Sequence, residues 1–257
     1  MRHSRVLFLA AALALSVCGA GGGTSANDFK KAGEFYLASQ FEQAIALYKT
    51  LLAASPHSAA LHYNLGNSYF KSGSLGPATA SYLRAYALAP LDADIGYNLD
   101  FCLKKVGETL YPPGVPKPLF LAFHALSLNA VAAAFWILSC GLLLSLSLYP
   151  WTTAGLRPHP ALQALLGRLI VFFLLFDAAF GSWWWLRSSQ EKGLGVVVRN
   201  GTEVRNGPGE NFSVGFTVPE GRRVKVLETR ADWAEIGVLK EGVRGWLLKD
   251  SIIVVND

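Results

Sequence analysis

The hydrophobic and polar positions divide the chain into segments of different kinds. A basic start and an apolar run from Val6 to Val17 are followed by small residues up to Ala26, which is the pattern of a cleaved export leader over residues 1–26. From Leu119 to Leu156 the chain has no formally charged residue. Residues 194–257 alternate short apolar stretches with Gly, Asn, Asp and Pro, as strands and turns do. The pattern therefore predicts an exported chain with membrane spans and a β-domain.

The leader has a second interpretation. The tetrapeptide LSVC resembles a lipobox in which Cys18 would be acylated, although Val17 stands where such boxes usually carry Gly, Ala or Ser. Both interpretations place the residues that follow outside the cytoplasm.

A 34-residue repeat follows the leader. The tripeptide YNL at 63–65 returns at 97–99, and three further residues recur at the same period: Ala44, Tyr48 and Pro56 as Ala78, Tyr82 and Pro90. A 34-residue period with a proline closing each unit is the tetratricopeptide signature. We expect a repeat domain over 27–110, made of two full repeats and a third first-helix that caps them.

The residue types support this prediction. Gly66 and Ala78 let two antiparallel helices approach closely, while Tyr69 and Tyr82 fill the space beside them. In the cap, Asp100 stands where Gly or Ala is usual, which is consistent with a helix exposed on its far side.

Two membrane spans are predicted after a proline-rich linker. YPPGVPKP cannot continue a helix, so residues 111–126 are assigned to a linker and pre-membrane segment. Because about 20 apolar residues cross a bilayer, the spans are placed at 127–149 and 165–186, joined by a cytoplasmic loop over 150–164. Aromatic residues at the span ends, Tyr149, Trp151 and Trp183 to Trp185, are typical of membrane interfaces. Since the leader exports the repeats, we expect the C-terminal part to return to the same side.

The C-terminal segment predicts five short strands in a small closed barrel. Its stretch VRNGPGENF contains two glycines around a proline, but a phosphate cradle needs a following helix and usually a lysine. We therefore interpret it as a loop between strands. Residues 194–257 resemble the bacterial SH3 domain, on the pairs Val204-Arg205, Gly207-Pro208 and Gly245-Trp246 together with Gly221 and Trp233.

Composition removes several function classes. The formal charge of +5 comes from residues that flank the apolar segments, so no basic face indicates nucleic-acid binding. The three cysteines and five histidines show no metal-ligand spacing, and no nucleophile stands beside a base in a known motif. We therefore expect a protein that is not an enzyme and needs no cofactor or metal.

In this order the segments form a multi-domain protein with all-α tetratricopeptide helical repeats, two transmembrane α-helices and a small all-β SH3-like barrel. The combination resembles the BatE-type aerotolerance proteins of Bat operons across essentially the whole chain. That resemblance implies a scaffold or adaptor in the bacterial inner membrane, with both terminal domains on the periplasmic side. Its implied partners are von Willebrand A-domain Bat proteins and, indirectly, a MoxR-type ATPase. The alternative is an anchor or envelope sensor that binds peptidoglycan through the SH3 domain.

Three sets of residues are candidate sites. The first helices of the repeats are expected to line a partner groove through Tyr63, Asn64, Asn67, Lys71, Tyr97, Asn98, Phe101 and Lys105, where the asparagines either bind a partner backbone or merely bridge helices. In the barrel, Glu210, Asn211, Trp233 and Trp246 are candidates for glycan or stem-peptide binding, although both tryptophans are also expected core residues. Asp177 lies near the centre of the second span, where an acidic residue usually faces a partner or remains protonated.

We expect Asp177 to lie level with Phe135 to Ser139 of the first span, so that Trp136 or Ser139 donates a hydrogen bond to it. The nearby small residues Ala178, Gly181 and Ser182 are expected to allow close contact between the spans. The carboxylate then either forms an internal polar clasp or pairs with another membrane protein.

Overall fold

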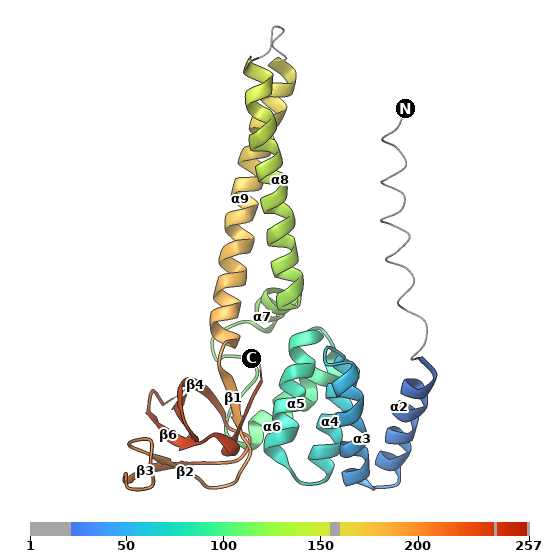
Figure 1. Cartoon of the computed structure of the whole chain (residues 1–257), viewed down its shortest axis with the longest axis vertical. Helices are drawn as coiled ribbons and strands as arrows, with labels where there is room; N and C mark the ends of the chain where they lie inside the picture. Colours follow the sequence, from blue (N-terminus) through green and yellow to red (C-terminus); the bar gives the residue numbers. More distant parts are fainter. Residues whose placement is uncertain (1–21, 155–159, 239–240, 256–257) are drawn as a thin grey trace.

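The computed structural model describes residues 22–154, 160–238 and 241–255. Figure 1 shows a long helical hairpin with the helical repeats and the β-domain side by side at one of its ends. The first described helix, α2, begins at Gly22, within the residues expected to form the leader. The rest of that leader and Cys18 lie outside the described residues.

Five helices form the repeat domain. The first repeat consists of α2 (Gly22–Leu37) and α3 (Phe41–Ala54), the second of α4 (Ala59–Lys71) and α5 (Leu75–Leu88), and α6 (Ala93–Lys105) follows as the cap. Polar side chains begin two of these helices, because Ser58 and Asp92 accept hydrogen bonds from the free backbone N–H groups of α4 and α6. The repeat period predicts a capping helix from Ala93 to Val106, and α6 ends one residue before that, at Lys105.

The close approach predicted at Gly66 is present. A Cβ there would lie 2.7 Å from the ring of Tyr82, so a side chain larger than hydrogen cannot fit between α4 and α5. Asp100 has a structural role that the sequence did not suggest, since its carboxylate accepts the backbone N–H of Leu110 at 3.0 Å and lies 2.6 Å from Nζ of Lys104. It thereby holds the segment that leaves α6.

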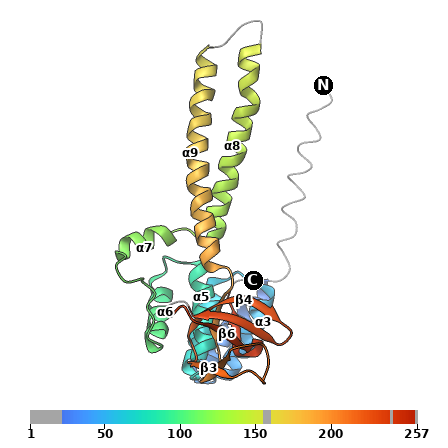
Figure 2. The same cartoon turned by 90° about the vertical axis from the view of Figure 1, so that its left-hand side faces the viewer.

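The hairpin consists of α8 (Leu128–Ala154) and α9 (Pro160–Glu191), both long and apolar enough to cross a membrane. The helices run beyond the predicted spans, so residues 150–154 and 160–164, expected as loop, are helical. The length of a membrane span is limited by the thickness of the bilayer, whereas a helix continues as long as its backbone N–H and C=O groups can form hydrogen bonds along it. The pre-membrane segment also contains a short helix, α7 (Lys117–His124), which projects to one side of the hairpin in Figure 2.

The contact between α8 and α9 agrees in part with the prediction. The Ser139 hydroxyl donates to Oδ1 of Asp177 at 2.7 Å, in the expected register. Gly181 lies against the ring of Phe135, where an added Cβ would be 3.0 Å away. Ala178 and Ser182, in contrast, are exposed and do not make this contact, because they follow Asp177 on other sides of the helix. Trp136 is exposed as well.

A second close contact was not predicted. Gly141 faces Phe173, whose ring would lie 2.7 Å from a Cβ at that position. An aromatic side chain therefore packs onto a glycine at two levels of the hairpin, once from each helix.

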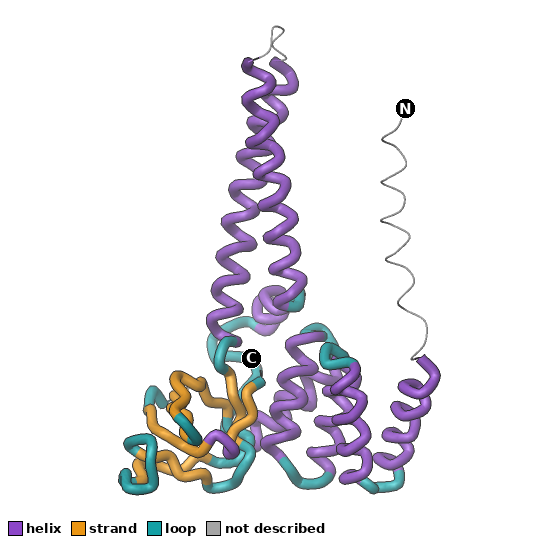
Figure 3. The backbone as a smooth tube through the Cα atoms, in the orientation of Figure 1, coloured by secondary structure: helices purple, strands orange, loops and turns teal. Residues whose placement is uncertain are grey.

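The β-domain has seven strands rather than the five expected. They are β1 (Leu194–Val197), β2 (Thr202–Arg205), β3 (Val214–Val218), β4 (Arg223–Arg230), β5 (Trp233–Val238), β6 (Arg244–Leu248) and β7 (Ile252–Val254). They form one antiparallel sheet in the order β3-β2-β6-β5-β4-β1-β7, with a 3₁₀ turn before β7 (Figure 3). The two extra strands, β2 and β3, flank the NGPG loop.

The barrel core and the repeat core meet. Valines from five strands, with Ala234, Ile236 and Leu247, form the interior of the sheet. A second apolar cluster joins α5 and α6 to Val196 of β1 and to Val255 after β7. The β-domain therefore packs directly on the second helix of the second repeat, and the two units share one continuous apolar contact.

Candidate functional site

The first helices of the repeats line a groove of about 290 Å³. Its walls come from α2, α4 and α6, with one residue from α5: Tyr36, Asn67, Phe70, Lys71, Tyr82, Tyr97, Asn98 and Phe101. Five of the eight residues predicted for this site therefore line it. Tyr36 and Phe70 were not predicted, although they lie exactly one 34-residue period apart on first helices, so the repeat itself carried the signal.

The floor of the groove is a hydrogen-bonded network. Asn98 donates from Nδ2 to the Tyr63 hydroxyl and to Oδ1 of Asn67, both at 3.1 Å. Tyr82 donates its hydroxyl proton to the same Asn67 oxygen at 2.7 Å. Burial raises the pKa of Tyr82 above its usual value, so the phenol stays protonated and remains a donor. Asn98 thus bridges α6 to α4, and its carbonyl oxygen keeps acceptor capacity.

The rim of the groove is aromatic and basic. Tyr97 is 71% exposed, and the exposed Phe101 packs against Phe70 with 5.7 Å between ring centroids. The Lys105 ammonium lies 5.4 Å from the centroid of the Phe101 ring, at the edge of this surface. Asn64, which was also predicted for this site, does not line the groove. The groove therefore offers exposed rings, positive charge and a polar floor.

The two tryptophans predicted for the barrel site differ from each other in burial. Trp246 is buried, as expected of a core residue, whereas Trp233 is only half-buried. Neither belongs to the cluster that fills the barrel, because their neighbours Ala234 and Leu247 point into it and side chains alternate along a strand. Trp246 is 8% exposed, and the Arg230 guanidinium lies 5.3 Å from the centre of its ring.

Glu210 and Asn211 lie exposed in the β2–β3 loop. Arg205, paired with Trp246 across the strands, donates to the backbone carbonyls of Glu210 and Phe212 at 2.9 Å. Gly207 in the same loop faces Phe212, whose ring would lie 2.4 Å from an added Cβ. The NGPG stretch is thus an ordered connection between β2 and β3, as predicted.

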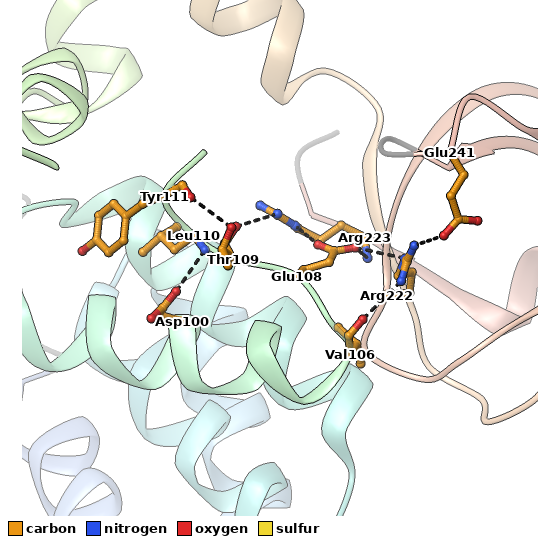
Figure 4. Close-up of polar contacts among 9 residues, drawn as sticks. All are labelled: Asp100, Val106, Glu108, Thr109, Leu110, Tyr111, Arg222, Arg223 and Glu241. Carbon is orange, nitrogen blue, oxygen red and sulfur yellow. Dashed lines mark hydrogen bonds and ion pairs between the residues drawn. The ribbon is translucent and has the colours of Figure 1, made fainter. Parts of the chain in front are cut away.

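The structure also contains an interface between the repeats and the barrel that the sequence did not indicate (Figure 4). Glu108, which follows the cap, is 4% exposed and lies between two arginines of the barrel. Its carboxylate is 3.3 Å from Nε of Arg222 and 2.5 Å from Nε of Arg223. Arg222 also donates to the Val106 carbonyl at 3.1 Å. A buried carboxylate held by two guanidinium groups fixes the end of α6 against β4.

A second part of the interface lies at the start of α5. The Gly76 backbone N–H donates to Oε1 of Glu220 at 2.7 Å, so a barrel carboxylate caps a repeat helix. Arg84, further along α5, donates to the Val254 and Val255 carbonyls at 2.6 and 3.1 Å. These contacts involve α5 and the segment after α6, and they leave the groove on the first helices uncovered.

Comparison with known families assigns both soluble regions. A model of the TPR (tetratricopeptide) repeat matches residues 34–73, and a model of the bacterial SH3 domain matches residues 200–253. No curated protein matches this sequence. Both matched families are non-catalytic binding modules, which agrees with a protein that is not an enzyme. The chain therefore carries a TPR region and a bacterial SH3 domain, separated in sequence by two helices able to span a membrane.

Proposed function

We propose that this protein is a membrane-anchored scaffold whose repeat groove binds an extended segment of another envelope protein. The resemblance to BatE-type proteins suggests a Bat-type complex in the inner membrane. Its direct partners would be von Willebrand A-domain membrane proteins, with a MoxR-type ATPase reached through them. In that setting the complex serves stress or oxygen tolerance.

The groove is the observation that carries this proposal. Its rim presents Tyr97, Phe101 and Lys71 to solvent, and its floor keeps an amide acceptor on Asn98. Exposed rings and a fixed amide suit an extended backbone with apolar side chains, and the lysines favour an acidic one. The β-domain packs on the other helices, so a partner has free access to the groove.

The arrangement of the domains supports the two-span topology. The repeats and the barrel lie at the same end of the hairpin and contact each other (Figure 1), which requires both to be on the same side of a membrane. Reporter fusions after Pro118 and after Asp257 should therefore both report export, and a fusion in the 155–159 connection should report cytoplasm. A cytoplasmic C-terminus would contradict the model.

Crosslinking in native membranes tests the groove. Tyr97→Ala combined with Phe101→Ala removes two exposed rings without touching the hydrogen-bonded floor, so the fold should be unchanged while partner recovery falls by at least about tenfold. Leu91→Ala is the matched control, because Leu91 is 62% exposed but lies outside the groove. Equal recovery from the double variant and the control would refute groove binding.

A second candidate function is peptidoglycan binding by the SH3 domain. It is favoured by the position of Trp233 on the outer face of the sheet, where a half-buried ring is available for stacking on a sugar. The full-length protein in detergent should then sediment with purified cell wall, and Trp233→Ala should reduce the sedimented fraction. If the wall retains no more of the wild type than of this variant, the domain binds protein or serves only to brace the repeats.

A further inference from the structure

The short helix α7 lies where the chain passes from the repeats into the hairpin of α8 and α9. It runs across the hairpin rather than along it, at the end that faces the repeats (Figure 2). Only three residues separate it from α8, which begins at Leu128. No described residue of α7 lines the repeat groove, so the proposed partner does not account for this helix.

One face of α7 packs on the repeat domain. The Phe120 ring lies 5.3 Å from the Tyr111 ring between centroids, and it stacks on His124 at 4.1 Å. The His124 ring in turn lies 6.4 Å from the ring of Tyr86, on α5. Phe120 and Tyr111 also pack against the apolar cluster that joins α5 and α6. This face of α7 is therefore already occupied by the protein itself.

A second face of α7 contacts the end of the hairpin. The Phe123 ring lies 6.0 Å from the Trp183 ring between centroids, and Trp183 donates from Nε1 to the Phe123 carbonyl at 3.0 Å. One turn further along α9, Arg187 donates to the Leu126 carbonyl at 2.5 Å. Tryptophans concentrate at the level of lipid headgroups, and Trp183 begins a run of three near the end of α9. With α9 across a bilayer, these bonds fix the end of α7 at headgroup depth.

Leu119 extends the face of Phe123 beyond the hairpin. The two residues are four apart and therefore lie on the same side of the helix. Phe123 is partly covered, whereas Leu119 is 63% exposed. Ala122, on the same side, is exposed as well, and Leu126 in the bend before α8 is 40% exposed. The segment thus presents an uncovered apolar surface that is continuous with a contact at headgroup depth.

We propose that α7 is an interfacial helix whose Leu119 face inserts into the lipid surface on the side of the repeats. The bilayer is the partner that the contacts favour, because the uncovered face continues from the Phe123–Trp183 contact and the chain enters α8 directly afterwards. On the other side of the helix, the Lys117 ammonium lies 5.0 Å from the centroid of the Tyr111 ring. An apolar face and a basic face are typical of helices that lie in a membrane surface.

Inserted in this way, α7 holds the repeat domain against the bilayer, because its other face is packed on α5 and on Tyr111. The inference rests on the two-span topology of the proposed function, but it does not require a partner in the groove.

Spin labels on the full-length protein in phosphatidylcholine vesicles measure the depth of this face. Each label is attached to one introduced cysteine, in a chain with Cys18→Ser and Cys140→Ser; Cys102 is 1% exposed and remains. Electron paramagnetic resonance compares collisions with oxygen, which concentrates in hydrocarbon, and with a nickel chelate, which stays in water. A label at Leu119→Cys should lie about 5–10 Å into the boundary between headgroups and acyl chains.

Lys117→Cys is the matched control, because Lys117 is exposed on the same helix but on its other side. Its label should be in water. A label at Ile137→Cys tests the spans on their own, since Ile137 is 72% exposed in the middle of α8 and should lie in the bilayer interior.

Equal access of the nickel chelate to the labels at Leu119 and Lys117, with the label at Ile137 in the bilayer, would overturn the interfacial helix and leave the two spans intact. Access of neither reagent to the label at Leu119 would also overturn it, because protein rather than lipid would then cover this face. A label at Ile137 in water would refute the spans and the interfacial helix together.

Discussion

The substitution Gly76→Ala probes the contact between the repeats and the barrel with a single methyl group. Gly76 lies in the first turn of α5, and a Cβ there would be 2.4 Å from the Val197 carbonyl oxygen and 2.7 Å from Cα of Val198. Both neighbours are backbone atoms, which cannot rotate away. Since favourable contacts between carbon atoms begin at about 3.5 Å, the barrel has to move by roughly 1 Å. The bond from the Gly76 N–H to Glu220 would lengthen with it.

Two effects of opposite sign compete in this variant. Alanine favours a helix over glycine by up to about 1 kcal/mol, and by less in the first turn. Overpacking against fixed atoms costs about 1–3 kcal/mol. We expect the interface to lose about 1–2 kcal/mol of its opening free energy. That loss corresponds to roughly 5- to 30-fold faster hydrogen exchange at the contact.

Hydrogen exchange followed by mass spectrometry on the full-length protein measures this effect. The most informative amide is that of Gly221, which donates to the displaced Val197 carbonyl at 2.8 Å. Gly96→Ala in α6 is the matched control, because its Cβ would meet the Tyr86 ring at 3.9 Å, an ordinary contact. The control should leave exchange at Gly221 unchanged and raise stability slightly. If Gly76→Ala behaves like the control, the two domains do not pack as described.

Three further outcomes follow from individual side chains. Glu108→Ala should lower the free energy of unfolding by about 2–3 kcal/mol, because it leaves two partly buried arginines without their shared carboxylate. Glu108→Gln should lower it by less. Denaturant titration distinguishes these losses from the effect of a neutral surface change. If the Asp177 carboxylate forms a neutral clasp, co-purification of partners should survive Asp177→Asn and fail with Asp177→Leu. If the carboxylate pairs with a charge, co-purification should fail with both variants. Normal assembly with Asp177→Leu would eliminate both roles. Burial lowers the pKa of His62 despite its bond to Pro56, so the unfolded chain binds more protons than the folded one below pH about 6.5. Stability should therefore be complete above that pH and fall on acidification by at most about 1.4 kcal/mol per pH unit, and an equally steep fall in His62→Gln would contradict this assignment.

The sequence by itself determined the modules and their order. The 34-residue period places residues on helices, because a repeat of fixed length returns each side chain to the same face of its unit. For that reason the cap at α6, the contact of Gly66 with Tyr82 and most of the groove were predictable, and Tyr36 and Phe70 could have been added. The apolar segments predicted two helices able to span a membrane for an equally local reason, since length and composition alone decide whether a helix can cross a bilayer. The position of Ser139 level with Asp177 was predicted by counting residues along the two helices of an antiparallel hairpin.

Only the tertiary structure decided which surfaces meet across long distances in the chain. Glu108 and Arg223 lie in different domains, and neither local period nor spacing couples them, so their ion pair had no signal in the sequence. Trp246 could equally have been a core residue or a surface one, because a one-residue change of register moves a strand side chain to the other face. Asn98 was placed correctly on the groove, but its bridge to α4 depends on how closely two helices approach. Contacts of this kind depend on packing of the whole fold, which fixes distances that the linear pattern leaves open.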